Sequence, residues 1–122
     1  ETIKIYHHEW SDKDPVKWSV GNSIIKEKSN VSENNYEEIP GVDLSEFIFS
    51  LNKEIDLIKM DVEGAEYLLI NHIIDTGAIN KVKILICETH EKKYDIFKKD
   101  TIKLKEKIKE LNLENKIYLD WR

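Results

Sequence analysis

Two short apolar runs separated by a helical pattern mark the centre of the chain. Residues 55–60 and 82–88 are mostly apolar, rich in β-branched side chains and short, which predicts two strands. Between them apolar residues recur with helical spacing, and Gly77 is well placed to end the helix. This order predicts a parallel βαβ unit whose first strand is covered on both faces. The predicted buried face of the helix comprises Ala65, Leu68, Leu69, His72 and Ile73.

The flanking segments carry weaker patterns. Residues 2–7 alternate between apolar and polar side chains, which predicts a short strand. Residues 16–39 suggest only a loose hairpin, with an acidic, Asn/Ser-rich loop at 29–38. Asp43, followed three residues later by Glu46, has the form of a capping box that opens a helix through about Leu51. The remaining predicted elements are a helix from about residue 95 or 101 to 113, with Ile102, Leu104, Ile108 and Leu111 on its apolar side, and a strand over 116–121.

Composition restricts the class of protein. A chain of 122 residues that is 40% hydrophobic predicts a single α/β domain, spanning residues 1–122, around one core. A net charge of −5 argues against a nucleic-acid binder, because neutralising phosphates needs a basic face. No apolar run approaches the length of about 18 residues that predicts a membrane helix. The single cysteine, Cys87, excludes an internal disulfide, lies inside an apolar strand and fits a small buried hydrophobe, so we expect a reducing, cytoplasmic location.

Ionisable side chains follow both central strands. Asp61 and Glu63 come after the first strand, and Glu88 and His90 come at the end of the second. Because the two strands are predicted to be parallel neighbours, we expect these groups to share one edge of the sheet. Ligands of open α/β sheets bind at this edge, outside the carboxyl ends of the strands. With Glu66, three carboxylates would stand at the start of the predicted helix. This arrangement disfavours a phosphate and favours a cationic, hydroxyl or metal ligand.

The same residues also have plainer interpretations. Asp61 serves equally well as a helix N-cap, and Glu63 and Glu66 as ordinary acids of the first helical turn. Gly64 costs up to about 1 kcal/mol against alanine in a helix, so close packing against a ligand or a strand explains it better. His90 is a candidate for proton transfer or substrate contact. Two further side chains are assigned structural roles, Lys59 as a buried partner of a carboxylate and His72 as a hydrogen-bonded core histidine.

The central segment also resembles a known family. Lys59-Met-Asp-Val-Glu-Gly-Ala-Glu66, led by residues 55–58 and followed by 84–88, is similar to the hallmark segment of the FkbM-type methyltransferases. Weaker similarity at residues 10–14, 21–23 and 42–45 extends the resemblance over nearly the whole chain. It implies a Rossmann-like sheet of the class I methyltransferases, S-adenosylmethionine as cofactor, and commonly O-methylation of a sugar or polyketide hydroxyl.

The resemblance also implies roles for the residues at the junction. A carboxylate there would hydrogen-bond the acceptor hydroxyl or help to place the donor, and the positive sulfonium suits an acidic site. Methyl transfer is an in-line displacement, so positioning supplies most of the catalysis. No metal is needed. By the resemblance, Asp12 would lie near the adenine, and Asp61 and Glu63 near the methyl-transfer centre. Together with the groups predicted from the strand ends, the expected catalytic residues are Asp61, Glu63, Glu66, Glu88 and His90, and the expected cofactor-binding residues are Asp12, Asp61 and Gly64.

One part of the family pattern has no counterpart here. The four glycines form no Gly-rich loop of the kind that holds the amino-acid part of the cofactor. The chain also begins at Glu1 and has Met60 as its one methionine, so we expect the C-terminal portion of a methyltransferase domain, lacking the N-terminal Gly-rich half. The edge of the first central strand would then be covered by upstream residues or by a partner chain, as in a homo-oligomer.

Two other function classes remain open. In a metal-dependent hydrolase, a divalent ion would be bound by Asp61, Glu63, Glu88 and His90. A non-catalytic module would use the family fold only for pairing with another chain. For the methyltransferase interpretation the expected partner is a small-molecule or glycan acceptor, with neither nucleic acid nor a membrane involved.

Overall fold

The computed structural model describes residues 1–14, 17 and 22–121. The parts of the predicted loose hairpin at positions 16 and 18–21 lie outside the described residues, as does Gly21 of the weaker family similarity. By its contacts the chain divides into two compact units. Unit 1 comprises Glu1–Gly41 and Val62–Ala65, and unit 2 comprises Val42–Asp61 and Glu66–Arg122.

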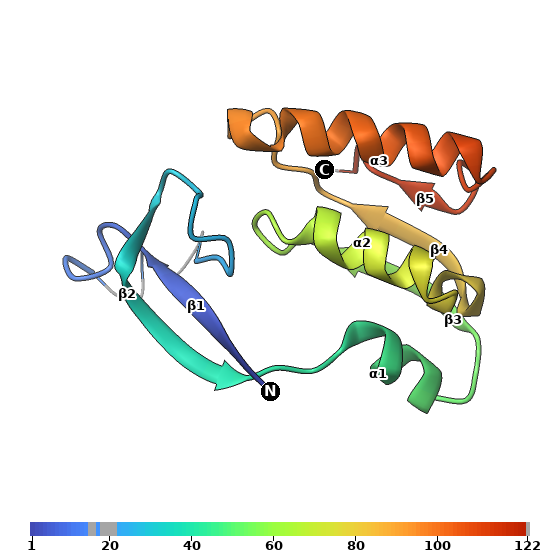
Figure 1. Ribbon diagram of the computed structural model, residues 1–122, viewed down its shortest axis with the longest axis horizontal. Helices are drawn as coiled ribbons and strands as arrows, with labels where there is room; N and C mark the ends of the chain where they lie inside the picture. The colour runs from blue at the N-terminus through green and yellow to red at the C-terminus, as the bar shows by residue number, and fades with distance from the viewer. Residues whose placement is uncertain (15–16, 18–21, 122) are drawn as a thin grey trace. The chain divides into compact units, whose positions relative to one another are not determined.

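Unit 1 is built on an antiparallel pair of strands, β1 (Thr2–His8) and β2 (Val31–Pro40) (Figure 1). The strand predicted over residues 2–7 is confirmed, whereas the loop predicted at 29–38 is wrong because most of it forms β2. Its Asn, Ser and Glu residues carry little strand propensity of their own. Backbone pairing with β1 supplies what the local sequence lacks, and Tyr36 packs on Tyr6 across the strands at 5.6 Å between ring centroids.

Unit 2 contains a parallel sheet in the order β3-β4-β5 (Figure 1). Its strands are β3 (Ile55–Met60), β4 (Val82–Cys87) and β5 (Ile117–Tyr118). The predicted βαβ unit is therefore confirmed, and the unit has a mixed α/β architecture. The helical elements are α1 (Leu44–Ser50), α2 (Glu66–Asp75), α3 (Lys98–Glu110) and the 3₁₀ turns η2 (Ala78–Lys81) and η3 (Asp95–Phe97).

Two predicted helix boundaries are confirmed by their backbone chemistry. Asp43 caps α1, because its Oδ1 accepts the backbone N–H of Glu46 at 3.0 Å. Beyond the end of α2, Gly77 adopts a left-handed φ of 79°, and its N–H donates to the carbonyl of Ile74 at 3.1 Å. Among the residues that the structure describes, no helix combines the length and apolar character needed to cross a bilayer.

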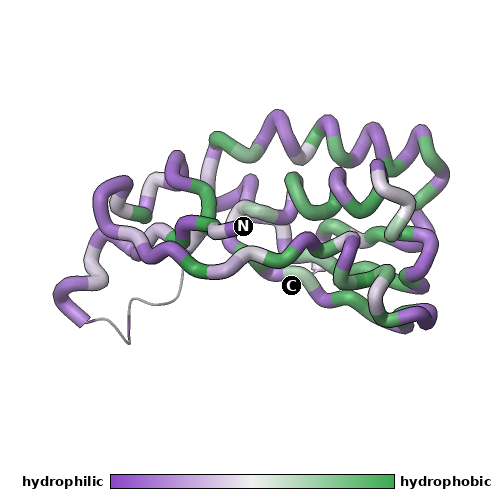
Figure 2. The backbone as a smooth tube through the Cα atoms, turned by 60° about the horizontal axis from the view of Figure 1, so that its bottom comes forward, coloured by the Kyte–Doolittle hydropathy of each residue, from purple (hydrophilic) through white to green (hydrophobic). Residues whose placement is uncertain are grey.

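The buried faces of the helices differ from the predicted ones. In α2 the buried side chains are Glu66, Tyr67, Ile70 and the predicted Ile73, while the predicted Leu68 is exposed. In α3, Ile102 is likewise exposed, and Thr101 takes its place in the core beside the predicted Leu104 and Ile108. Figure 2 shows the hydrophilic and apolar residues that alternate along α3. The apolar spacing alone allowed neighbouring stripes, and packing selects between them.

One face of the sheet also departs from expectation. Met60, Leu85 and Cys87 are buried with the helices, but Leu57 on the opposite face is 54% exposed. The prediction that β3 is covered on both faces is therefore wrong for the described chain, because the strand positions alternate between a packed and an open side.

Two single-residue predictions also need correction. Lys59 is exposed, and its ammonium lies 4.3 Å from the ring centroid of Trp121 instead of pairing with a carboxylate in the core. His72 is hydrogen-bonded as predicted, but it is a surface residue whose Nε2 lies 2.8 Å from Asp43. Its place on α2 is one position away from the buried Ile73, which explains why the periodicity misassigned it.

Candidate functional site

The junction between β3 and α2 is a turn, not the first turn of a helix. β3 ends at Met60 and α2 begins at Glu66, so Asp61, Glu63 and Gly64 precede the helix. The backbone explains this, because Glu63 has a φ of 52° and Gly64 a φ of 108°, values that a right-handed helix excludes. The helix-capping interpretation of Asp61 is therefore wrong. Gly64 suits the turn, whereas the left-handed conformation costs Glu63 about 1–2 kcal/mol.

Within unit 1, Glu63 is held by two residues that the sequence did not single out. The ammonium of Lys28, whose side chain is fully buried, forms an ion pair with the Glu63 carboxylate, which is 29% exposed. The hydroxyl of Ser23 donates to the backbone carbonyl of Glu63 at 2.6 Å. A buried lysine needs such a partner because desolvating an ammonium is costly. Both residues lie in a polar stretch that gave no periodic signal.

Within unit 2, Glu66 and His90 form a buried ion pair. Oε1 of Glu66 lies 2.7 Å from Nδ1 of His90, and both side chains have an exposed fraction of 0%. Nε2 of the same ring lies 3.7 Å from Oδ1 of Asp61, whose side chain is 42% exposed. Glu66 does lie in the first turn of α2, as one interpretation predicts, but it is fully buried and paired with an imidazole. The structure brings three predicted site residues together at the ends of β3 and β4.

Burial raises the pKa of two side chains next to this trio. Burial, reinforced by the carboxylates of Glu66 and Asp61, raises the pKa of the Cys87 thiol far above its usual range. Cys87 is thus the small buried hydrophobe that the sequence predicts. Burial also raises the pKa of Tyr67 to about 12, although the hydroxyl of Thr101, 2.9 Å away, donates to its oxygen.

The remaining predicted residues lie in other surroundings. Glu88 directs Oε1 toward the ammonium of Lys93 at 3.3 Å, and its backbone N–H donates to the carbonyl of Met60 at 3.0 Å. Asp12 is exposed on unit 1, in a turn closed by the N–H of Lys13. Within unit 2, no described side-chain contact joins Glu88 to the trio.

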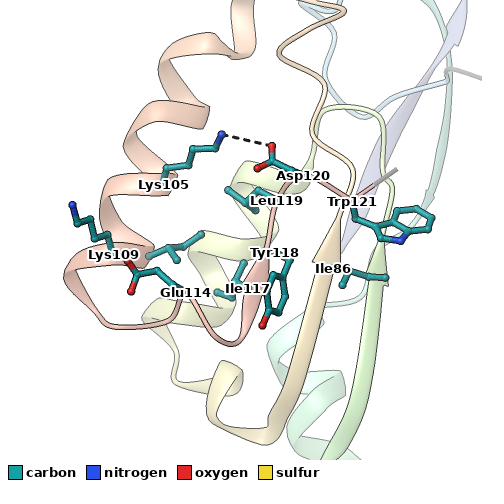
Figure 3. A pocket seen from close by; sticks show the side chains of 10 residues that line it. Ile86, Lys105, Lys109, Glu114, Ile117, Tyr118, Leu119, Asp120 and Trp121 are labelled. Carbon is teal, nitrogen blue, oxygen red and sulfur yellow. Dashed lines mark ion pairs between the residues drawn. The ribbon is translucent and has the colours of Figure 1, made fainter.

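A cavity of about 630 Å³ lies elsewhere in unit 2, between α3 and β5 (Figure 3). Its walls are mostly apolar, and the ammonium of Lys105 faces the carboxylate of Asp120 across its rim at 3.7 Å. No predicted site residue is among the described residues that line it. The cavity is formed by Ile86, Lys105, Ile108, Lys109, Glu114, Ile117, Tyr118, Leu119, Asp120 and Trp121.

Comparison with protein families shows which family the chain belongs to. A family model described as the methyltransferase FkbM domain matches residues 1–114. The chain belongs to the FkbM methyltransferase family. No curated protein and no solved structure matches the chain. FkbM membership confirms the resemblance of the central segment, and it gives no support to the metal-dependent hydrolase alternative.

In this FkbM family member the trio has a simple chemical layout. Asp61 is the member that solvent, and hence a ligand, can reach, while His90 and Glu66 lie behind it. Glu66 lies beside Nδ1 of the ring, and Asp61 lies beyond Nε2. A buried carboxylate thus orients an imidazole, and the imidazole faces a part-exposed carboxylate. Such an arrangement can hold a hydroxyl and accept its proton.

Proposed function

We propose that this FkbM family member is an S-adenosylmethionine-dependent methyltransferase with a class I, Rossmann-like fold, acting on a hydroxyl of a small molecule or sugar. The proposal rests chiefly on the Asp61–His90–Glu66 trio at the carboxyl ends of β3 and β4. Ligands of open α/β sheets bind at this edge. Family membership supplies the general chemistry.

The chemistry of Asp61 fits this cofactor. Its carboxylate is part-exposed and can face either a cation or the hydroxyl groups of a ribose or an acceptor. When bound, S-adenosylmethionine supplies a methyl group on a positively charged sulfur. Asp61 is the residue of the trio that would hold it, because the side chains of Glu66 and His90 are fully buried.

The protein's own contribution is orientation and proton acceptance. Asp61 accepts a hydrogen bond from the acceptor hydroxyl, which directs a lone pair of the oxygen toward the methyl group, and then takes the proton. His90 lies behind this carboxylate, with its Nε2 3.7 Å from Oδ1 of Asp61. Glu66 fixes the ring at Nδ1, so that both act as positioning residues.

The test is release of S-adenosylhomocysteine from the protein mixed with S-adenosylmethionine and a panel of sugars and small alcohols. Asp61→Asn should lower kcat/KM by about 100-fold or more, the usual contribution of a general base. His72→Gln is the matched control, because His72 pairs with a carboxylate on the surface, and it should leave kcat/KM unchanged. The proposal would be contradicted if none of the acceptors gave product, or if Asp61→Asn and the wild type reacted at equal rates.

A further inference from the structure

Two other residues of unit 1 hold the left-handed turn before α2. Both contact Glu63, one at its carboxylate and one at its backbone carbonyl. We infer that Lys28 and Ser23 are positioning residues for the methyl-transfer site, and that Glu63 works with them instead of contacting substrate. The role in methyl transfer rests on the proposed function, whereas the role of Lys28 and Ser23 in holding the turn does not.

The turn itself is an unusual piece of backbone. Glu63 and Gly64 have successive positive φ values of 52° and 108°, and the N–H of Ala65 donates to the carbonyl of Val62 at 3.3 Å. Glutamate rarely adopts this conformation, so the surroundings must hold it there. Such strain is commonly found where geometry serves function.

Lys28 holds the side chain of Glu63. The lysine side chain is fully buried, and its ammonium donates to Oε2 of Glu63 from 35 residues earlier in the chain. An ammonium removed from water depends strongly on an anionic partner. One oxygen of the Glu63 carboxylate is therefore held by Lys28.

Ser23 holds the main chain of the same residue. Its hydroxyl donates to the carbonyl of Glu63 at 2.6 Å. Ser23 is itself anchored to β1, because its N–H and carbonyl are both paired with the backbone of Tyr6, at 3.0 and 2.7 Å. The carboxylate and the carbonyl of Glu63 are thus fixed by separate residues of one unit.

The consequence follows from chain continuity. Asp61 immediately precedes the turn and Glu66 immediately follows it. The direction in which the backbone leaves β3 and begins α2 decides how these two carboxylates stand relative to His90. A turn that relaxes would misplace the trio without removing any of its members, and small misplacements of reacting groups are costly in rate.

Hydrogen exchange tests the structural part without any need for activity. Lys28→Met removes the ammonium and keeps an apolar stem, and it should speed amide exchange at residues 63–66 by about tenfold or more. Exchange in α3 should not change. Lys26→Met, an exposed lysine two positions earlier, is the matched control and should leave the turn as in the wild type. If Lys28→Met fails to fold, Ser23→Ala tests the same turn.

Kinetics then test the positioning role. Lys28→Met and Glu63→Gln should each lower kcat/KM by about tenfold, and the double variant should be no worse than the poorer single one, because both break one pair. The inference would be overturned if Glu63→Gln lowered kcat/KM more than Lys28→Met did and the two losses added in the double variant, because Glu63 would then have a role of its own. Wild-type exchange at residues 63–66 in Lys28→Met, or in Ser23→Ala, would overturn it as well. If the variants exchanged faster but the wild type transferred no methyl group, the role of Lys28 and Ser23 in holding the turn would be supported and the proposed function refuted.

Discussion

The turn at Val62–Ala65 and the first turn of α2 each hold a glutamate against a basic side chain, but the two pairs differ in burial and in chemistry. In the turn the buried partner is Lys28, and Glu63 remains 29% exposed. In α2 both Glu66 and His90 are fully buried. Lysine offers a compact ammonium on a flexible stem, whereas histidine offers a planar ring whose two nitrogens can face two different partners. One acidic motif thus holds one part-exposed pair and one fully buried pair.

A third pair allows the effect of burial to be separated from the effect of residue type. Asp43 and His72 also join a carboxylate to an imidazole, at 2.8 Å, but both side chains are about 40% exposed. Water solvates both groups at this position, so their mutual contribution is small. The pair therefore serves as a surface counterpart of Glu66–His90 within the same unit.

The largest effect on stability is expected from His90→Leu. The substitution leaves the Glu66 carboxylate in the core without its imidazole partner, which should lower the free energy of unfolding by about 3–5 kcal/mol. Chemical denaturation measures this loss, and His72→Leu is the matched surface control. Equal losses for the two variants would contradict the distinction between buried and surface pairs.

Glu63→Gln should have the next largest effect. It deprives the buried ammonium of Lys28 of its ion-pair partner while keeping an amide that still accepts a hydrogen bond. The expected loss of unfolding free energy is about 1–3 kcal/mol, measured in the same denaturation experiment. A loss larger than that of His90→Leu would reverse the proposed ranking of the two pairs.

Lys28→Met should cost less than Glu63→Gln, although both break the same contact. The carboxylate that remains is part-exposed and can be hydrated, so the free energy of unfolding should change by less than about 1 kcal/mol. A small global change combined with fast local exchange in the turn is the pattern that a positioning residue predicts. A global loss as large as that of Glu63→Gln would instead indicate a purely structural role.

The smallest effect is expected from Asp43→Asn, and it should depend on pH. The backbone N–H of Glu46 and, second, His72 hold the pKa of Asp43 below its ordinary value of 3.8. The charge therefore stabilises the fold fully above that value, and the stabilisation is lost as the pH falls through the lower, folded-state pKa. Denaturation midpoints of the wild type and Asp43→Asn should converge in acid. A constant difference at every pH would contradict this assignment.

The sequence predicts the centre of the fold better than its periphery. Residues 55–60 and 82–88 predict parallel strands because their short apolar runs are separated by a helical pattern. β2 escapes prediction because its Asn/Ser-rich sequence becomes a strand only through pairing with β1, which lies distant in the chain. The buried stripe of α2 matches the prediction only in part, and in α3 Thr101 is buried instead of Ile102, because several spacings satisfy the same periodicity.

The candidate site is predictable in part for a similar reason. Parallel strands bring their carboxyl ends together, so a meeting of Asp61 and His90 could be expected from topology. The left-handed turn could not, since glutamate gives no local signal for a positive φ. Nor could the burial of Lys28, which depends on a partner distant in sequence and looks like a solvated charge beside Lys26 and Glu27.

Calorimetric titration with S-adenosylmethionine tests the central claim most directly, because it asks whether the strand-end trio binds the methyl donor. The wild type and the His72→Gln control should bind with the same affinity, and Asp61→Asn should bind about tenfold or more weakly, as expected for loss of a charged contact. Absence of binding heat for the wild type, or equal affinities for the wild type and Asp61→Asn, would contradict the assignment of the site.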